Sequence, residues 1–139
     1  MSSTNVQFST GIHILVGLAA HYGNDVTSSS LASSVNAEPS FVRKVISKLV
    51  KAGLVESTRG KNGACSLAKS PKSITLLDIY QAIEAPQIFN IHTYPVQKSC
   101  TISCNIKGQL ESTLGNVQKA MEKELSKITL DKITNEITQ

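Results

Sequence analysis

The sequence has no long apolar run. None of its stretches approaches the roughly 20 consecutive apolar residues that a membrane-spanning helix needs. The first residues also lack a basic leader followed by an apolar segment, which is the mark of a secretory signal peptide. We therefore expect a cytoplasmic protein with no membrane partner.

The common catalytic motifs are missing as well. There is no Cys-x-x-Cys pair, no βαβ pattern around the cysteines, no glycine-rich loop for a phosphate, and no serine–histidine–acid set that can be placed. These absences argue against an enzyme, and in particular against a cysteine-based oxidoreductase.

Cysteine is scarce and its number is odd, since the chain has only Cys65, Cys100 and Cys104. Three thiols cannot all pair within one chain, and a reducing compartment disfavours disulfides. We interpret these cysteines as free thiols, metal ligands or redox sensors rather than as bridges that hold the fold together.

The 139 residues suffice for one domain with its own core and an added dimerisation element.

The first half of the sequence is basic. Residues 1–72 hold eight basic and three acidic residues, whereas residues 73–139 hold six basic and seven acidic ones. This uneven charge predicts a polyanion-binding surface in the first half.

Residues 27–67 predict a short helix, a turn, a second helix and a β-hairpin. Pro39 suits the first turn of the second helix, where its missing N–H needs no acceptor, and Gly53 suits a left-handed C-cap. Residues 54–57 and 64–68 predict two strands, joined by a turn at 59–63. The apolar residues of the second helix recur at helical spacing on one face: Val42, Val45, Ile46, Leu49 and Val50.

Helix, helix and basic hairpin is the order of a winged helix-turn-helix, whose second helix enters the major groove of DNA. A small helical domain with a solvated basic face, or a winged helix that binds protein rather than DNA, is the alternative. For base edges and adjacent phosphates we predict Arg43, Lys44 and Ser47. For other phosphates we predict Ser40, Lys48 and Lys51. For the minor groove or its phosphates we predict Arg59, Lys61 and Asn62 on the hairpin.

The remaining elements flank this stretch. Residues 5–22 predict a helix with one apolar face, and residues 75–84 predict another, with Thr75 and Asp78 spaced as a capping box. We divide the chain into a DNA-binding domain at 1–85, a loop at 86–104, and a dimerisation helix with a short last helix at 105–139. Thr129 is the expected cap of that last helix.

Residues 103–128 predict a long helix with a narrow apolar stripe of near-heptad spacing. We expect the stripe to form a homodimer interface, because a twofold dimer matches a palindromic DNA site. The alternative is that the stripe packs on its own domain. The interface residues would be Ile106, Leu110, Leu114, Val117, Met121 and Leu125, with Ile128 at the end of the stripe.

This set of features resembles the Rrf2 family of bacterial winged helix-turn-helix regulators. The matching segments read LA at 31–32, SFV at 40–42, LVKAGLV at 49–55, RG at 59–60, G at 63, LA at 67–68 and ITLLDI at 74–79. The resemblance implies a homodimeric transcription regulator, more often a repressor, with a DNA-binding winged domain and a long dimerisation helix.

The cysteines depart from the family pattern. Cluster-binding members carry three cysteines before the dimerisation helix, whereas this chain has only Cys100 and Cys104 there, and Cys65 replaces an aromatic residue on the wing. A cluster generally needs four ligands. We therefore expect no cofactor. The alternative is an iron–sulfur cluster whose thiolate ligands come from both subunits.

A thiol switch ranks above the cluster. Cys100 lies near Lys98 and the start of the long helix, and both a cation and a helix N-terminus favour thiolate. Cys104 is the expected resolving partner, and Cys65 is the next candidate for redox sensing. The alternative is that these cysteines are merely small apolar residues.

Overall fold

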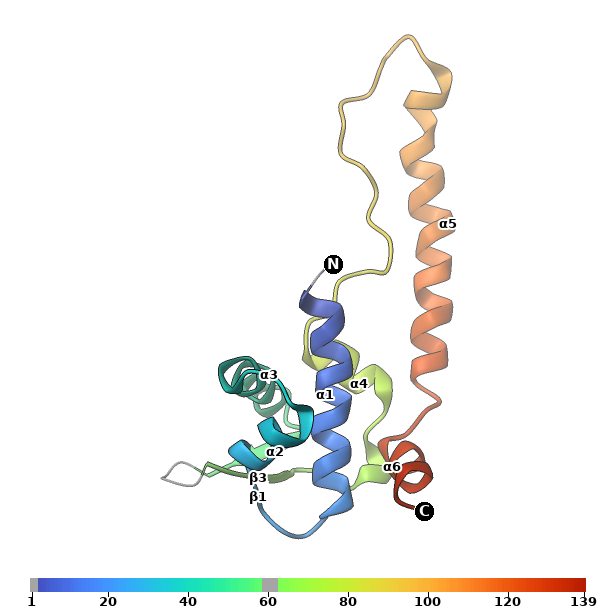
Figure 1. Cartoon of the computed structure of the whole chain (residues 1–139). Helices are drawn as coiled ribbons and strands as arrows, with labels where there is room; N and C mark the ends of the chain where they lie inside the picture. The colour runs from blue at the N-terminus through green and yellow to red at the C-terminus, as the bar shows by residue number, and fades with distance from the viewer. Residues whose placement is uncertain (1–2, 59–62) are drawn as a thin grey trace. The chain divides into compact units, whose positions relative to one another are not determined.

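The computed structural model of the chain describes residues 3–58 and 63–139 (Figure 1). It is mainly α-helical with one small antiparallel sheet, which confirms the predicted fold class. None of the helices in the described residues is long and apolar enough to cross a membrane. In chain order the elements are α1 (Ser3–Ala20), β1 (Val26–Thr27), α2 (Ser28–Val35), α3 (Pro39–Lys51), β2 (Val55–Ser57), β3 (Ala64–Leu67), a 3-10 turn (Pro71–Ser73), α4 (Leu76–Ala82), α5 (Thr101–Leu125) and α6 (Leu130–Thr138).

The chain divides into two compact units. The winged unit comprises residues 1–85 and 125–139, and the long-helix unit comprises residues 86–124. Residues 125–139, which the sequence grouped with the long helix, thus pack with the first 85 residues.

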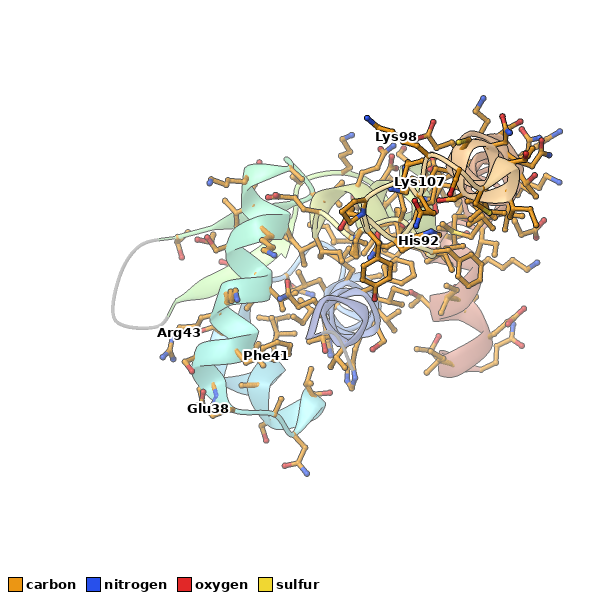
Figure 2. All side chains as sticks on the ribbon, turned by 90° about the horizontal axis from the view of Figure 1, so that it is seen from above. Glu38, Phe41, Arg43, His92, Lys98 and Lys107 are labelled. Carbon is orange, nitrogen blue, oxygen red and sulfur yellow. The ribbon has the colours of Figure 1, made fainter. Side chains whose placement is uncertain are left out.

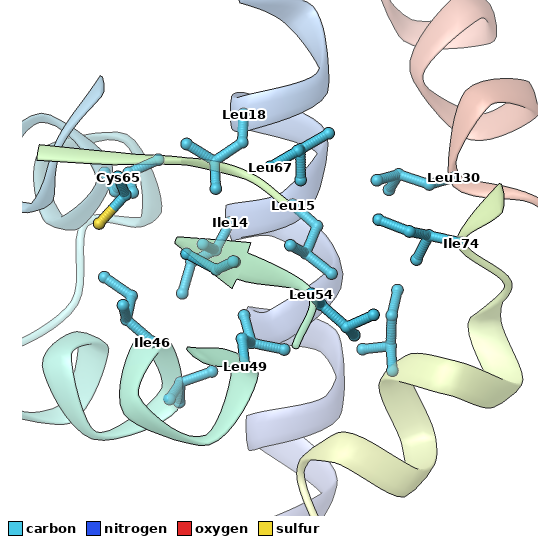
Figure 3. Close-up of a cluster of buried hydrophobic side chains, with 14 of the residues drawn as sticks. Ile14, Leu15, Leu18, Ile46, Leu49, Leu54, Cys65, Leu67, Ile74 and Leu130 are labelled. Carbon is cyan, nitrogen blue, oxygen red and sulfur yellow. The ribbon is translucent and has the colours of Figure 1, made fainter. Parts of the chain in front are cut away.

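Helix α1 is the centre of the winged unit. It packs against α2, α3, α4, α6 and β3. Figure 3 shows Ile14, Leu15 and Leu18 of α1 among core side chains that include Leu49 of α3, Leu67 of β3 and Leu130 of α6. Each of the three α1 side chains is at most 1% exposed. The sequence predicts a single apolar face made of Phe8, Ile12, Leu15, Val16 and Ala19, of which only Leu15 is fully buried. The difference has a simple cause, since a helix covered on several sides needs apolar residues around its whole circumference.

Helices α2 and α3 form the helix-turn-helix. Thr27 caps α2, because its Oγ1 accepts a hydrogen bond from the N–H of Ser30 at 3.1 Å. Asn36 ends α2 with a φ of +60°, a conformation that asparagine tolerates better than most residues. Pro39 occupies the first turn of α3, as predicted. Four residues of the predicted apolar face are buried in the core: Val42, Val45, Ile46 and Leu49.

Helix α3 ends in the glycine C-cap that the sequence predicts. Gly53 has a φ of +79°, and its N–H donates to the carbonyl of Val50 at 3.0 Å. The N–H of Leu54 donates to the carbonyl of Leu49 at 3.0 Å, which completes a Schellman motif. Because Leu49 and Leu54 are both buried, this cap also fixes where the chain enters the wing.

The wing is a three-stranded sheet in the order β1-β3-β2. Strand β3 pairs antiparallel with both neighbours, so that Cys65 lies opposite Val26 on one side and Ser57 on the other. The sequence did not predict β1, because two residues are too few to show an alternating pattern. The N–H of Ser28 donates to the carbonyl of Gly63 at 3.1 Å, which joins the wing to the start of α2. Of the predicted turn, residues 59–62 lie outside the described residues.

Helix α6 is held to the start of α4. The predicted capping box is confirmed, since the N–H of Thr75 donates to Asp78 at 2.9 Å and the N–H of Asp78 donates to Thr75 at 3.1 Å. The N–H of Leu130 donates to the carbonyl of Ile74 at 2.8 Å, and both side chains are fully buried. Thr129 caps α6, as predicted. The last helix is therefore part of the core of the winged unit.

The long-helix unit contains the segment 86–100 and most of α5 (Figure 1). The segment runs along the helix, and the N–H of Ile88 donates to the side chain of Gln118 at 3.0 Å. Helix α5 begins at Thr101, two residues earlier than the sequence predicted. Cys104, which was expected in the loop, therefore lies in the first turn of the helix.

Candidate nucleic-acid interface and thiol pair

The polar side of α3 is the candidate DNA-reading surface. Its apolar side is buried in the core, which leaves five of the predicted contact residues exposed: Ser40, Arg43, Lys44, Ser47 and Lys51. In Figure 2 the side chain of Arg43 extends away from α3 on the side opposite α1. Because the apolar side of α3 stays in the core of the winged unit, its basic exposed side can enter a DNA groove without any change in that core.

Two surface hollows flank Arg43. One, of about 290 Å³, is lined by Ser28, Ser29 and Ser33 of α2, and the other, of about 280 Å³, reaches Ser57 and the base of the wing. Helix N-termini and serine hydroxyls are common ligands of DNA phosphates. The sequence predicts Thr27 or Ser28 as the cap of α2 and assigns no DNA contact to Ser28 or Ser29, although the run of serines directly after Thr27 is a usable signal.

Glu38 is the acidic residue of this surface, and the sequence did not single it out. It caps α3, and its Oε2 accepts hydrogen bonds from the N–H of Ser40, at 3.1 Å, and from the Ser40 hydroxyl. The hydroxyl contact is the main reason that the pKa of the Glu38 carboxyl is lowered; a smaller desolvation effect opposes it, and Arg43 adds to the lowering. Ser40, predicted to bind phosphate, thus has its hydroxyl engaged by a carboxylate.

Lys48 differs from its predicted role. It is half-buried, and its Nζ donates to Oε1 of Gln7 at 2.8 Å and to the carbonyl of Ile83 at 3.4 Å. Gln7, on α1, is only 3% exposed. Lys48 therefore joins α3 to α1 and to the end of α4 instead of extending toward a phosphate. Helical spacing within α3 could not reveal a polar acceptor on another helix.

Of the predicted site residues on the hairpin, the structure describes only Cys65. Arg59, Lys61 and Asn62, predicted to contact DNA, lie outside the described residues. Cys65 lies at the base of the wing and is 2% exposed. Burial, and to a smaller degree the Asp25 carboxylate, raises the pKa of the Cys65 thiol. A buried thiol held in its neutral form is a poor nucleophile, so the structure gives Cys65 a packing role.

Cys100 and Cys104 form the thiol pair at the start of α5. Cys100 is half-buried, and its Sγ accepts a hydrogen bond from the N–H of Ser103 at 3.4 Å. Cys104 is exposed, and its Sγ lies 3.5 Å from the carbonyl of Lys98. The N–H of Cys104 donates to the carbonyl of Cys100 at 3.0 Å, so one helical turn separates the two residues. All three cysteines are described, and none forms a disulfide.

The donor set of one chain does not fit an iron–sulfur cluster. The long-helix unit supplies two thiols, whereas a cluster generally needs four ligands. Among the described residues there is no group of three or more histidine, cysteine or acidic side chains placed to hold a metal ion.

The apolar stripe of α5 is only partly covered by the described residues of its own chain. Helix α5 is described in full, and none of its 25 residues is buried. Ile106, Leu110, Leu114 and Met121 are half-buried, and Val117 is 42% exposed. The last predicted interface residue, Leu125, instead packs against the core of the winged unit.

A helix-turn-helix followed by an antiparallel wing, with a basic exposed face on its second helix, defines a winged-helix DNA-binding regulator. The family model named Rrf2, described as an iron-dependent transcriptional regulator, matches residues 4–136. The chain belongs to the Rrf2 family of DNA-binding transcription regulators, and it is not an enzyme. The resemblance that the sequence suggested is thereby confirmed.

Relatives and solved structures agree with this family. YwnA of Bacillus subtilis (strain 168), named as an HTH-type transcriptional regulator, is 37% identical over 135 residues, which cover 96% of this chain and 98% of that protein. The crystal structure of a transcriptional regulator from Lactobacillus plantarum has a TM-score of 0.82 at 25% identity and covers 96% of this chain and 91% of that chain. CymR, the global cysteine regulator of B. subtilis, shares the fold, with a TM-score of 0.70 at 23% identity over 98% of this chain and 96% of that chain.

Proposed function

We propose that this regulator is a homodimeric repressor that binds a palindromic operator and releases it when the thiol pair is oxidised. The observation that carries the proposal is the exposed basic face of α3, bordered on one side by the serines of α2 and on the other by the base of the wing. Major-groove recognition by a helix of this kind is the shared property of winged regulators.

The side chains of this surface have different roles in the proposal. Arg43 reads a base edge, because a guanidinium can donate two hydrogen bonds to a guanine. Lys44, Ser47 and Lys51 bind phosphates or neighbouring bases. Ser28 and Ser29 add phosphate contacts from α2. Glu38, an acceptor at the start of α3, disfavours non-specific approach to the polyanion and can accept from a cytosine amine.

Dimerisation is proposed to use the stripe of α5. An apolar stripe that the described residues of its own chain leave partly exposed is expected to pack against another helix, and a second α5 offers the same pattern. Because Leu125 already packs on the core of the winged unit, the proposed interface runs from Ile106 to Met121.

The thiol pair is proposed as the sensor, without a resident cofactor. A peroxide converts the Cys100 thiolate to a sulfenic acid with release of hydroxide. The Cys104 thiol then attacks that sulfur, water leaves, and a disulfide forms. Two residues one helical turn apart have Cα atoms about 6 Å apart, within the range that a disulfide spans.

Footprinting and gel-shift titration on the DNA upstream of the protein's own gene test this function. We expect protection of a palindromic site by the reduced protein. Arg43→Ala should weaken operator binding by about 1–3 kcal/mol and change the preferred sequence. Lys69→Ala, which removes an exposed charge that is not on α3, is the matched control and should keep the preference.

Binding without sequence preference, with a salt dependence equal to that on random DNA, would contradict the proposal. That outcome would favour a winged helix that binds protein. Purified protein that carries iron and needs it for operator binding would favour the cluster alternative, with thiols from both subunits.

A further inference from the structure

We propose that a surface cavity between α1, α2 and α6, open to solvent on one side, binds a small apolar carboxylic acid as an effector. The cavity measures about 440 Å³, and all its lining residues lie in the winged unit. This volume lies within the range of about 300–1,000 Å³ that is usual for small-molecule sites. The inference requires neither the thiol pair nor the α5 interface.

The walls of the cavity are mainly aliphatic. Ile12 and Val16 line it from α1, and Ile133 and Ile137 line it from α6. Gly17 and Ala20 leave room on the α1 side. A Cβ at Gly17 would lie 3.2 Å from a methyl carbon of Leu31, so this part of the wall must stay small. The lining therefore favours an apolar ligand body.

The polar groups of the cavity define the headgroup. His13 on α1 and Ser34 on α2 both line it, and His13 Nε2 lies 3.0 Å from Ser34 Oγ. Both side chains can donate hydrogen bonds to a carboxylate, and His13 is the one lining residue whose side chain can carry a charge, which is positive. The lining residues, all of them described, include no acidic side chain that could bind an ammonium group. An acid therefore fits this site better than an amine.

The position of the cavity couples it to DNA binding. The His13–Ser34 hydrogen bond joins α1 to α2, and α2 leads through the turn at 36–38 into α3. A carboxylate that takes over these donors replaces that direct link, while the ligand body contacts α6. Coupling of this kind is reciprocal, so a ligand that alters operator affinity must itself be bound differently when the operator is present.

Octanoate is a suitable probe, and octylamine, of equal chain length and opposite charge, is its matched control. Calorimetric titration of the full-length reduced protein should show saturable binding of one octanoate per chain. Octylamine should bind at least tenfold more weakly. The same octanoate concentration should change the operator dissociation constant at least threefold in a gel shift.

Two variants locate the site. Ala20→Leu fills the cavity, and Ile137→Gln adds a polar wall at a side chain that is 64% exposed and so tolerates substitution. Each should weaken octanoate binding at least tenfold while ligand-free operator binding stays unchanged. Ala68→Leu, on an exposed alanine outside the cavity, should bind octanoate as wild type does. No saturable binding, equal binding of the amine, or wild-type binding by Ala20→Leu and Ile137→Gln would overturn the proposal.

Discussion

At the scale of single residues, Lys44 and Lys48 lie about one turn apart on α3 but in different surroundings. Lys44 is exposed, whereas the Lys48 ammonium donates to the buried side chain of Gln7. Lys48→Met should lower the free energy of unfolding by about 1–3 kcal/mol, because the buried Gln7 oxygen loses its donor. Lys44→Ala should instead weaken all DNA sites alike and reduce the salt slope of binding by about one. Urea unfolding and salt-dependent gel shifts measure the two effects, and a reduced salt slope in Lys48→Met would contradict the assignment.

Because of Cys65, we expect the free energy of unfolding to fall as the pH becomes alkaline. Burial first, and Asp25 second, raise the pKa of its thiol above the value in the unfolded chain. The stabilisation from this group is therefore complete below the unfolded pKa of about 8.5 and is lost as pH rises through the folded value. In urea unfolding between pH 7 and pH 10, the free energy of unfolding should fall less with rising pH in Cys65→Ala than in wild type. The exposed Cys104→Ala is the control and should follow the wild-type slope.

At the scale of elements, the cap at the end of α3 fixes the position of the wing. Gly53 has a φ of +79°, where a side chain is strained although no atom lies within 4 Å of an added Cβ. Gly53→Ala should therefore lower the free energy of unfolding by about 1–2 kcal/mol. Gly108→Ala, in the interior of α5 and equally open, should raise it by about 0.5–1 kcal/mol. Thermal unfolding of both variants tests whether backbone conformation, rather than the space around the added Cβ, decides the effect of each substitution on stability.

Elements with a local cause could be predicted from the sequence. Pro39, Gly53 and the Thr75–Asp78 box act through neighbours within four residues, and each has its predicted place. What depends on distant partners could not be predicted. The inward turn of Lys48 depends on Gln7 of α1, and the pairing of β1 depends on a strand almost 40 residues later. For the same reason the α6 wall of the cavity, which is built against α1, left no recognisable pattern.

At the scale of the whole molecule, the α5 stripe is proposed to set the distance between two DNA-binding units. Leu114→Glu would place a charge in the proposed apolar interface, which is costly unless the charge is paired. Sedimentation should show a monomer, and operator affinity should be lost while helix content largely persists. Ser112→Glu, on the opposite side of the same helix, is the control and should remain a dimer. A Leu114→Glu protein that stays a tight dimer would contradict the proposed interface.

Oxidation of the thiol pair is expected to act on that same distance. Both recognition helices of a dimer must enter grooves about one helical turn of DNA apart. A disulfide between Cys100 and Cys104 would restrain the junction between segment 86–100 and α5. Peroxide should therefore weaken operator binding, and a dithiol reductant should restore it. Cys100→Ser should bind the operator normally and ignore peroxide. Cys104→Ser should accumulate a sulfenic acid at Cys100, detectable by dimedone labelling and mass spectrometry, without forming the internal disulfide. If Cys100→Ser still responds to peroxide as wild type does, the sensor is not this pair.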